Sequence, residues 1–456
     1  MGFKYLDCIF IVFICIFFNA CASMGDIEKL DTLYYQNNNL ADSYNYSQKY
    51  VKDDFLWALQ SGILGFQMGD FQNSIDSFNM AEVYFEINSQ ENVFQNAFKT
   101  IISVLVSNGM FKYYGNLYEA TFINYYKALN FMMLKDYASS RVEFNRANDR
   151  QRRSKEFFAS RINQIQDTIN NSNMENINDI KTLQSMDSIY NAQYKNLDRF
   201  KAYDGYINPM VSYVSGIFFL LQNDFNKAND LLKESYAVSG ESRILDDILL
   251  LNNRKENIDT KKYTWIFIED GQSPKKYEMR LNVPLFLPDD IIYFNIALPK
   301  LDSGKIFHYK YYISLDSKDS INSFELLNIE SMVSNEFSIE IPYIIITSLI
   351  SSTYKAYLQS ILNKNLGLIG SIGGMLFSSI SANADIRNSR ILPLRFLAIR
   401  VENKEQVFKL FGDRKMLYSF MLDNDCKELC LNRDNIVYIR VMQNGIISIL
   451  THSIGG

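Results

Sequence analysis

Histidine is scarce in this chain, with two residues among 456. This leaves little material for histidine metal sites or for histidine-based catalysis. The sequence also has no basic block and carries a formal net charge of −5, which argues against a nucleic-acid partner. A triplet glycine pattern is absent, and 47% hydrophobic with 21% charged residues exclude a disordered chain. A length of 456 residues predicts two or three domains.

Patterns that mark nucleotide, metal or hydrolase sites are missing too. The chain contains no GxxxxGK[ST], HExxH, GxSxG or EF-hand pattern. His308 falls in an expected strand and His452 near the C-terminal end, and a structural role is favoured for both. We therefore expect no enzyme, no cofactor and no metal ion.

The N-terminus carries an unbroken apolar run at residues 8–18. A helix of this length rises about 16 Å, roughly half of a bilayer core, so the run fits a signal peptide better than a transmembrane helix. Phe18-Asn19-Ala20-Cys21 follows and looks like a bacterial lipobox. This implies a signal peptide at 1–20, lipidation of Cys21 and anchoring through acyl chains. Ala22, the second residue after cleavage, resembles the sorting pattern of the outer membrane, so the protein is expected to be anchored there and to face the periplasm. The alternative interpretation of this N-terminal segment is an ordinary secretory signal or an N-terminal anchor.

Cysteine is limited to three residues once 1–20 are removed: Cys21, Cys426 and Cys430. An export compartment permits disulfides, and the spacing of Cys426 and Cys430 allows one to close, although it is not typical. A free pair is the alternative. A metal site at this pair is not expected, because no third ligand is near in sequence.

Residues 21–258 are predicted to form an all-α domain, because proline is almost absent and apolar residues recur every three or four positions. One pattern returns three times. A small residue precedes an Asp-aromatic pair by eight positions, and small, large and small residues follow the Asp at four, eight and eleven. This resembles the tetratricopeptide repeat (TPR) and implies a helical solenoid. The repeat positions are Gly62, Asp70, Phe71, Phe78, Ala81, Ala128, Asp136, Tyr137, Phe144, Ala147, Gly216, Asp224, Phe225 and Ala228.

Each repeat position has an expected physical role. The small residue lets the second helix approach the first, and the Asp opens the second helix near its positive end. Solenoids of this kind mostly bind peptides or partner proteins on a concave face. A basic stretch at 146–155 is interpreted either as a site for an acidic partner or lipid headgroup, or as a solvated helix face. Interspersed acidic residues favour the solvated face.

Near residue 260 the apolar period changes from 3.6 to 2, which predicts a β-rich domain at 259–456. Eight to ten short strands at this spacing suggest a sandwich. The expected strands are 263–271, 274–286, 290–301, 307–317, 322–329, 391–402, 405–412, 416–422, 435–442 and 445–452. The predicted fold class is therefore α+β: an N-terminal all-α TPR-like solenoid, then a β-sandwich-like domain with a helical-hairpin insertion at about 343–384.

The insertion ends in an uncharged run at 365–384 that includes a GxxxG step from Gly370 to Gly374. Buried packing of small residues is favoured over contact with a membrane or a second copy, because frequent Ser and Asn make the run marginal for insertion. A phosphate site is disfavoured, because the glycine spacing is not GxGxxG.

The order of these segments resembles a family of uncharacterised bacterial lipoproteins that combine TPR-like repeats with a C-terminal β-rich domain. The most specific stretches are YYGNLYEATFINYYKALNFMMLKDYASSRVEFNRANDRQ and ADIRNSRILPLRFLAIRV. The resemblance implies localisation and architecture rather than chemistry. Its motif positions are interpreted as a shared surface or the contact between the two halves, or alternatively as a buried ion pair or turn. They are Tyr114, Gly115, Glu119, Ala384, Asp385, Arg387, Leu392 and Pro393.

Together these features favour a lipid-anchored cell-envelope scaffold or adaptor. It would bind an envelope protein or peptide through its TPR-like repeats, without catalytic activity. One alternative is a membrane-active or pore-associated component that uses 343–384. Another is a regulator of an envelope enzyme, such as one that acts on peptidoglycan. The sequence indicates no oligomeric state.

Overall fold

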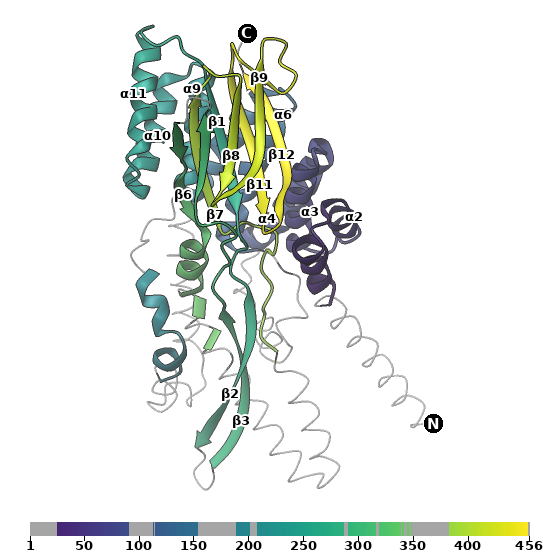
Figure 1. The fold of residues 1–456 in the computed structure, drawn as a ribbon. Helices are drawn as coiled ribbons and strands as arrows, with labels where there is room; N and C mark the ends of the chain where they lie inside the picture. Colours follow the sequence, from purple (N-terminus) through teal and green to yellow (C-terminus); the bar gives the residue numbers. More distant parts are fainter. Residues whose placement is uncertain are drawn as a thin grey trace.

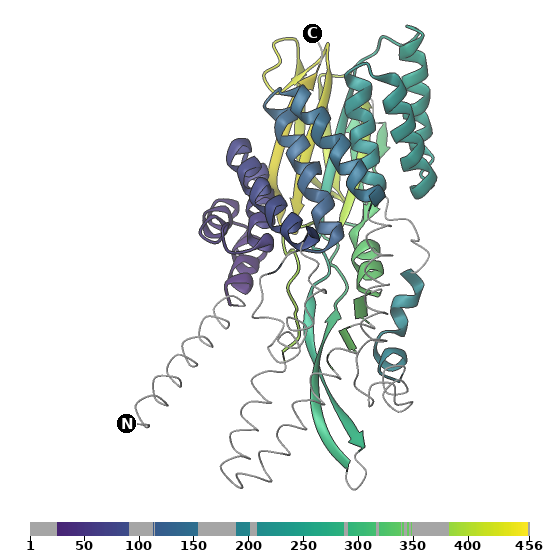
Figure 2. The same cartoon turned by 180° about the vertical axis from the view of Figure 1, so that it is seen from behind.

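The protein combines a helical part with two five-stranded β-sheets and a two-stranded β-ribbon. The computed structural model describes residues 25–90, 113, 115–153, 188–200, 208–286, 291–315, 319–338, 340–341, 344–345, 348 and 383–454. Helices prevail up to Lys255, and strands begin at Tyr263. The predicted α+β class is confirmed. Figures 1 and 2 show from opposite sides that the helices cover one face of the sheets.

Antiparallel helix pairs make up most of the helical part. α3 (Phe55–Met68) packs on α4 (Phe71–Gln90), and α9 (Pro209–Leu221) packs on α10 (Phe225–Ser239). α6 (Leu117–Met133) is followed by a helix at 137–153. The other helical segments are 25–31, η1 (Thr32–Gln36), α2 (Leu40–Gln48), 188–193, η3 (Lys195–Phe200) and α11 (Arg243–Lys255).

Two five-stranded sheets lie beyond the helices. The first sheet has the strand order β12-β11-β1-β7-β6, and the second sheet has the order β10-β9-β8-β4-β5. β1 lies at the centre of the first sheet, parallel to β11 and antiparallel to β7. The strands are β1 (Tyr263–Asp270), β4 (Tyr311–Leu315), β5 (Ser320–Asn322), β6 (Phe324–Asn328), β7 (Arg395–Glu402), β8 (Val407–Gly412), β9 (Lys415–Asp423), β10 (Leu429–Cys430), β11 (Asp434–Met442) and β12 (Gly445–Ile454).

A separate two-stranded ribbon extends away from both sheets (Figure 1). It consists of β2 (Lys276–Phe286) and β3 (Ile291–Leu301), which, among the strands that the structure describes, pair only with each other. The sequence pattern predicted these strands together with those of the sheets. A helix that begins at residue 329 lies beside the ribbon, and it starts well before the expected insertion boundary at about 343.

Apolar side chains hold the layers together on both faces of the first sheet. Alternate residues of a strand point to opposite faces, so Ile266 and Ile268 of β1 face the second sheet while Trp265 and Phe267 face the helices. The described cluster on the helical side contains residues from the helix pairs and from the first sheet. The helices and the first sheet therefore share one hydrophobic core.

Candidate functional site

The N-terminus of α6 is where the helical layer meets the segment that leads into β7. Glu119, in the first turn of α6, is fully buried. Its carboxylate accepts hydrogen bonds from the Tyr113 hydroxyl at 2.6 Å, the Asn116 amide at 2.9 Å and the Ser389 amide at 2.7 Å. Burial raises the pKa of Glu119. The Ser389 bond joins the two segments that carry the predicted motif positions.

The turn before α6 depends on Gly115. This residue has a φ of 89°, and a Cβ there would overlap the ring of Phe55. Asn116 caps the helix and forms a reciprocal capping box with Glu119. The Asn-x-x-Glu spacing is the sequence signal for this helix start. Tyr114 lies outside the described residues.

The second motif segment forms an ion pair next to the same turn. Asp385 and Arg387 are 2.8 Å apart, and the Arg387 guanidinium lies 5.3 Å from the ring centre of Tyr113. The Ala384 amide donates to Glu278 of the ribbon at 3.0 Å. Two further motif positions are buried: Leu392 and Pro393. The described motif positions thus lie at a contact between helices, ribbon and sheet.

Glu336, which no sequence pattern singles out, completes this contact. Its carboxylate oxygens accept the Leu117 amide at 2.8 Å and the Tyr118 amide at 3.0 Å, at the start of α6. Burial, together with the nearby Glu340, raises the pKa of Glu336 to about 8. These bonds span 219 and 218 positions, so no local sequence pattern could have found them.

A second buried cluster joins α6 to the first sheet. Glu269 of β1 accepts hydrogen bonds from the hydroxyls of Tyr126 and Tyr438. Arg440 of β11 donates to the Tyr34 hydroxyl at 3.1 Å. Burial raises the pKa of Glu269, while the Arg440 charge lowers it. These side chains are almost fully buried, so their polar groups depend on one another rather than on solvent.

A third cluster ties α11 and α9 to β1 and β7. Asp247 accepts hydrogen bonds from the Tyr213 hydroxyl at 2.7 Å, Arg400 at 2.6 Å and the Trp265 indole at 3.3 Å. Burial raises the pKa of Asp247, and the Arg400 charge opposes that shift. Each of the three clusters connects the helical layer to strands or to the segments beside them.

Both histidines have neighbours that account for them structurally. His308 lies 3.4 Å from Asp413, and His452 Nε2 lies 3.0 Å from the Tyr137 hydroxyl. Burial lowers the pKa of His452 to about 4, so it is neutral at neutral pH. Within the described ranges, no group of three His, Cys, Asp or Glu residues is arranged to hold a metal ion.

The Asp of each predicted repeat lies directly before the second helix of its pair. Asp136 and Asp224 accept the amide three positions later, at 3.0 and 3.3 Å. Asp70 instead accepts a hydrogen bond from the Tyr44 hydroxyl at 2.9 Å. The three aspartates therefore share a position, but only two are shown capping a helix amide.

Small residues bring the paired helices close together. A Cβ on Gly62 would lie 2.7 Å from the Phe78 ring, and one on Gly216 would lie 2.9 Å from Leu232. The other buried repeat positions are Ala81, Ala128, Phe144, Ala147 and Ala228. The partly buried ones are Phe71, Tyr137 and Phe225.

The basic stretch at 146–155 lies largely on the helix at 137–153. Its four arginines are ion-paired: Arg146 with Glu143, Arg150 with Glu82, Arg152 with Glu234 and Arg153 with Asp149. Carboxylates of the protein itself therefore balance these charges, which supports the solvated helix face over a site for an acidic partner.

The remaining predicted positions concern cysteines and the insertion. Cys426 and Cys430 form a disulfide with their Cα atoms 4.3 Å apart. Cys21 and most of 343–384 lie outside the described residues. In the part of the chain that the structure describes, no helix has both the length and the apolar character to cross a membrane.

Comparison with known proteins adds no family assignment. No protein-family model matches the chain, and no curated protein matches its sequence. Inferences about function therefore rest on the residues and their contacts.

Proposed function

We propose that the protein is a lipid-anchored scaffold or adaptor of the bacterial cell envelope. It is attached to the outer membrane through Cys21, faces the periplasm and binds an envelope protein or peptide without catalysing a reaction. In this proposal the helix pairs form a TPR-like solenoid and the two five-stranded sheets a β-sandwich-like unit. The lipobox and the resemblance to TPR-containing lipoproteins support the localisation.

The observation that carries the proposal is a row of helix pairs backed by a sheet. The first helix of each pair packs on the first sheet through aromatic contacts at ring-centre distances of 5.3–6.2 Å: Phe66 with Tyr438, Phe122 with Phe396, and Tyr213 with Phe267. Such pairs contribute about 0.5–1.5 kcal/mol each beyond area burial. The face that touches the sheet is occupied by the protein itself, so a partner would bind the second helices.

Buried ion pairs through α6 tie the second helices of the first two pairs to each other. Lys127 of α6 contacts Glu82 of α4 at 2.9 Å and Glu143 of the helix at 137–153 at 3.2 Å. Val83 and Val142, on these two helices, are each 48% exposed. Because these ion pairs already hold the two helices in place, little conformational entropy of this protein would be lost when a partner binds the surface that carries Val83 and Val142.

Crosslinking of intact envelopes followed by pull-down tests this function. Val142→Glu is expected to lower capture of the specific partner about tenfold, because an unpaired charge would enter the interface. Lys409→Glu, on the second sheet, is the matched control and should leave capture unchanged. Cys21→Ala should release the protein from the membrane fraction while purified protein still binds the partner. Failure to capture a specific partner, or capture unaffected by both Val83→Glu and Val142→Glu, would count against the proposal.

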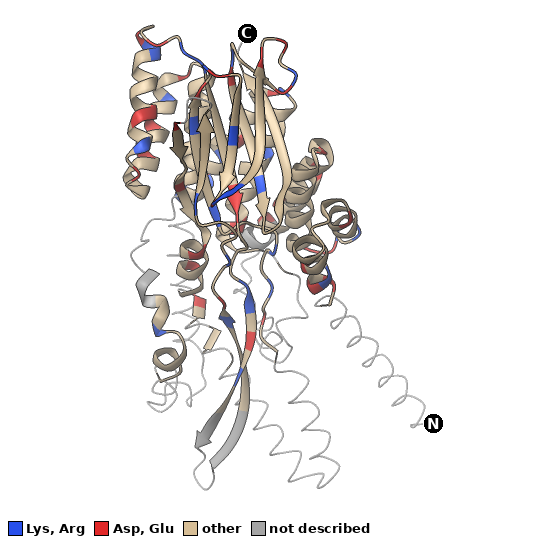
Figure 3. Ribbon diagram, in the orientation of Figure 1, with Lys and Arg blue, Asp and Glu red and all other residues tan. Residues whose placement is uncertain are grey.

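A membrane-active role is the second candidate, and the ribbon favours it. Six consecutive residue pairs of the β2–β3 ladder, from Leu281–Ile296 to Phe286–Ile291, contain no charged residue. Charged residues lie nearer the sheets, as Figure 3 shows. A two-stranded hairpin alone is marginally stable in water, and the described part of this ladder is covered by the helix that begins at residue 329, since Ile296 and Leu281 pack with Phe337.

The ends of the predicted insertion lie beside the same ribbon. Ile345 belongs to one apolar cluster with Ile296 and Leu298, and Arg280 donates to the Asn383 side chain at 3.4 Å. Protease protection of 343–384 that appears only when liposomes are present would support the membrane role. Full protease accessibility with liposomes present would exclude it.

A further inference from the structure

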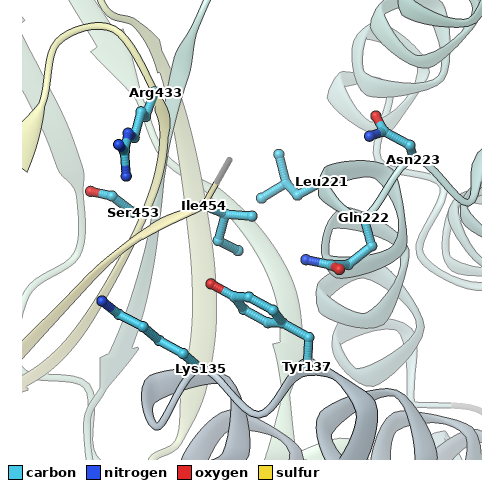
Figure 4. A pocket seen from close by; sticks show the side chains of 8 residues that line it. All are labelled: Lys135, Tyr137, Leu221, Gln222, Asn223, Arg433, Ser453 and Ile454. Atoms are coloured by element: carbon cyan, nitrogen blue, oxygen red, sulfur yellow. The ribbon is translucent and has the colours of Figure 1, made fainter. Parts of the chain in front are cut away.

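A cavity of about 370 Å³ opens where two helix pairs meet the first sheet. It is lined by the turn after α6, the turn after α9 and the edge of the sheet: Lys135, Tyr137, Leu221, Gln222, Asn223, Arg433, Ser453 and Ile454 (Figure 4). Its size falls within the usual range for small-molecule sites. None of the roles assigned above uses this cavity.

The lining is apolar at depth and cationic at the rim. Leu221 and Ile454 are buried, whereas Lys135 and Arg433 are exposed. Figure 4 shows the Tyr137 hydroxyl pointing toward Ile454, with the Gln222 amide on the opposite side of the cavity from Lys135. None of the described residues that line the cavity is acidic.

The nearest carboxylates on the same turns are engaged in other bonds. Asp136 accepts the Ser139 amide at 3.0 Å, and Asp224 pairs with Arg141 at 2.6 Å. His452, which bonds to Tyr137, also faces this side and is neutral at neutral pH because burial lowers its pKa to about 4. Among the described residues that line the cavity, the charged side chains are the two cations Lys135 and Arg433.

Backbone conformation provides a second, independent observation. The turn residue of the first helix pair is Gly69, with a φ of 78°. At the corresponding turns of the other two pairs stand Lys135 and Asn223, with φ of 64° and 60°. Glycine adopts this conformation without penalty, whereas a lysine is strained in it. Strained residues are found at functional sites, and Lys135 lines the cavity, whereas Asn223 beside it adopts this conformation more readily.

We propose that this cavity binds a small organic anion, with a carboxylate or phosphate held between Lys135 and Arg433 and an apolar body on Leu221 and Ile454. The two cations supply charge-assisted hydrogen bonds, and the Tyr137 hydroxyl supplies a further polar contact. The apolar floor sets a preference for ligands that carry a hydrocarbon group over bare inorganic ions. This site does not depend on the scaffold role.

Isothermal titration calorimetry of the full chain at low salt tests the site. The probes are benzoate and phenyl phosphate, with inorganic phosphate, benzyl alcohol and benzylamine as comparisons. At least one of the two aromatic anions is expected to bind, and the stronger of them identifies the head group. Lys135→Gln and Arg433→Gln should each weaken its binding by about tenfold or more. Lys409→Gln, on the second sheet, should leave binding unchanged.

Lys135→Gly separates loss of function from loss of folding. It removes the cation and relieves the strained backbone, so its unfolding midpoint should rise while its affinity for the anion falls as in Lys135→Gln. Absence of binding by both aromatic anions would overturn the proposal. Equal binding of benzyl alcohol would overturn charge recognition, and equal binding of inorganic phosphate would overturn the role of the apolar floor.

Discussion

Replacing Glu336 by Gln is expected to flatten the pH dependence of stability. Glu336 holds the start of α6 through two backbone amides, and its pKa is raised to about 8 from an ordinary value of 4.5. Gln cannot ionise, so it resembles the protonated side chain at every pH. The variant therefore isolates the contribution of one buried carboxyl group.

The sign follows from the direction of the pKa shift. A carboxyl group with a raised pKa in the folded state binds more protons there than in the unfolded state, so its contribution is present at low pH and lost as pH rises through 4.5 to 8. The slope is about 1.4 kcal/mol per pH unit, so from pH ~5 to ~7 the wild type loses about 2.7 kcal/mol relative to the variant. At low pH the variant is about 1–3 kcal/mol less stable if one backbone amide is left unsatisfied.

Urea unfolding at several pH values between ~5 and ~8 measures this difference. The free energy of unfolding of wild type minus that of Glu336→Gln should fall steadily with pH, and contributions of carboxyl groups that do not interact with Glu336 cancel. Glu256→Gln, at the exposed C-terminal cap of α11, is the control and should run parallel to wild type. A difference between wild type and Glu336→Gln that stays constant with pH would refute the reasoning.

Three further changes test packing, charge and backbone strain. Asp270→Asn breaks a buried ion pair with Arg395 at 2.6 Å and should lower the free energy of unfolding by about 3–5 kcal/mol, because the Arg395 charge stays buried without its partner. The double variant Asp270→Leu with Arg395→Met should lower it less in denaturant unfolding. Equal losses in both variants would argue against an uncompensated charge as the cause. Gly62→Ala places Cβ 2.7 Å from the Phe78 ring and should cost about 1–3 kcal/mol, partly restored by Phe78→Leu; no rescue would place the strain elsewhere. Lys135→Gly should gain about 1–2 kcal/mol in thermal unfolding, and a loss would show that the turn is not strained.

Much of the secondary structure could be predicted because its causes are local. The period-2 stretches at 263–271, 405–412 and 435–442 correspond to β1, β8 and β11. Asp136 and Asp224 lie at helix starts because short carboxylates cap exposed amides. Each of these features depends on neighbours only a few positions away.

The arrangement of these elements depends on distant partners and could not be predicted in the same way. β2 has the same alternation as a sheet strand, yet within the described part of the chain it pairs with β3 and joins neither five-stranded sheet. β5 and β10 are too short, at three and two residues, to produce a period. Glu336 follows a hydrophobic strand and a helix start without any motif, and only the folded chain places it against α6.

The same holds for the candidate sites. Glu119 and Asp385 were singled out by resemblance, and the structure places their segments in contact through Ser389 and Tyr113. The anion cavity had no sequence signal of its own, because its lining comes from two turns and a strand end. The available clue in the sequence is the residue before the Asp of each repeat, which is a glycine at Gly69 but a lysine at Lys135.

The central position of β1 has a consequence for how the chain reaches its native state. Its pairing partners come much later in the sequence: Asp270 pairs with Arg395, 125 positions on, and Thr264 lies beside Asn435, 171 positions on. Long-range pairing of this kind slows folding. The helical layer packs on β1 and β7 as well as on β11, so its apolar cover is complete only when the last two strands have formed. A nascent chain that stops before residue 434 therefore leaves part of the apolar helical face, around Phe66, without its cover, and such exposed surface favours aggregation of the incomplete chain.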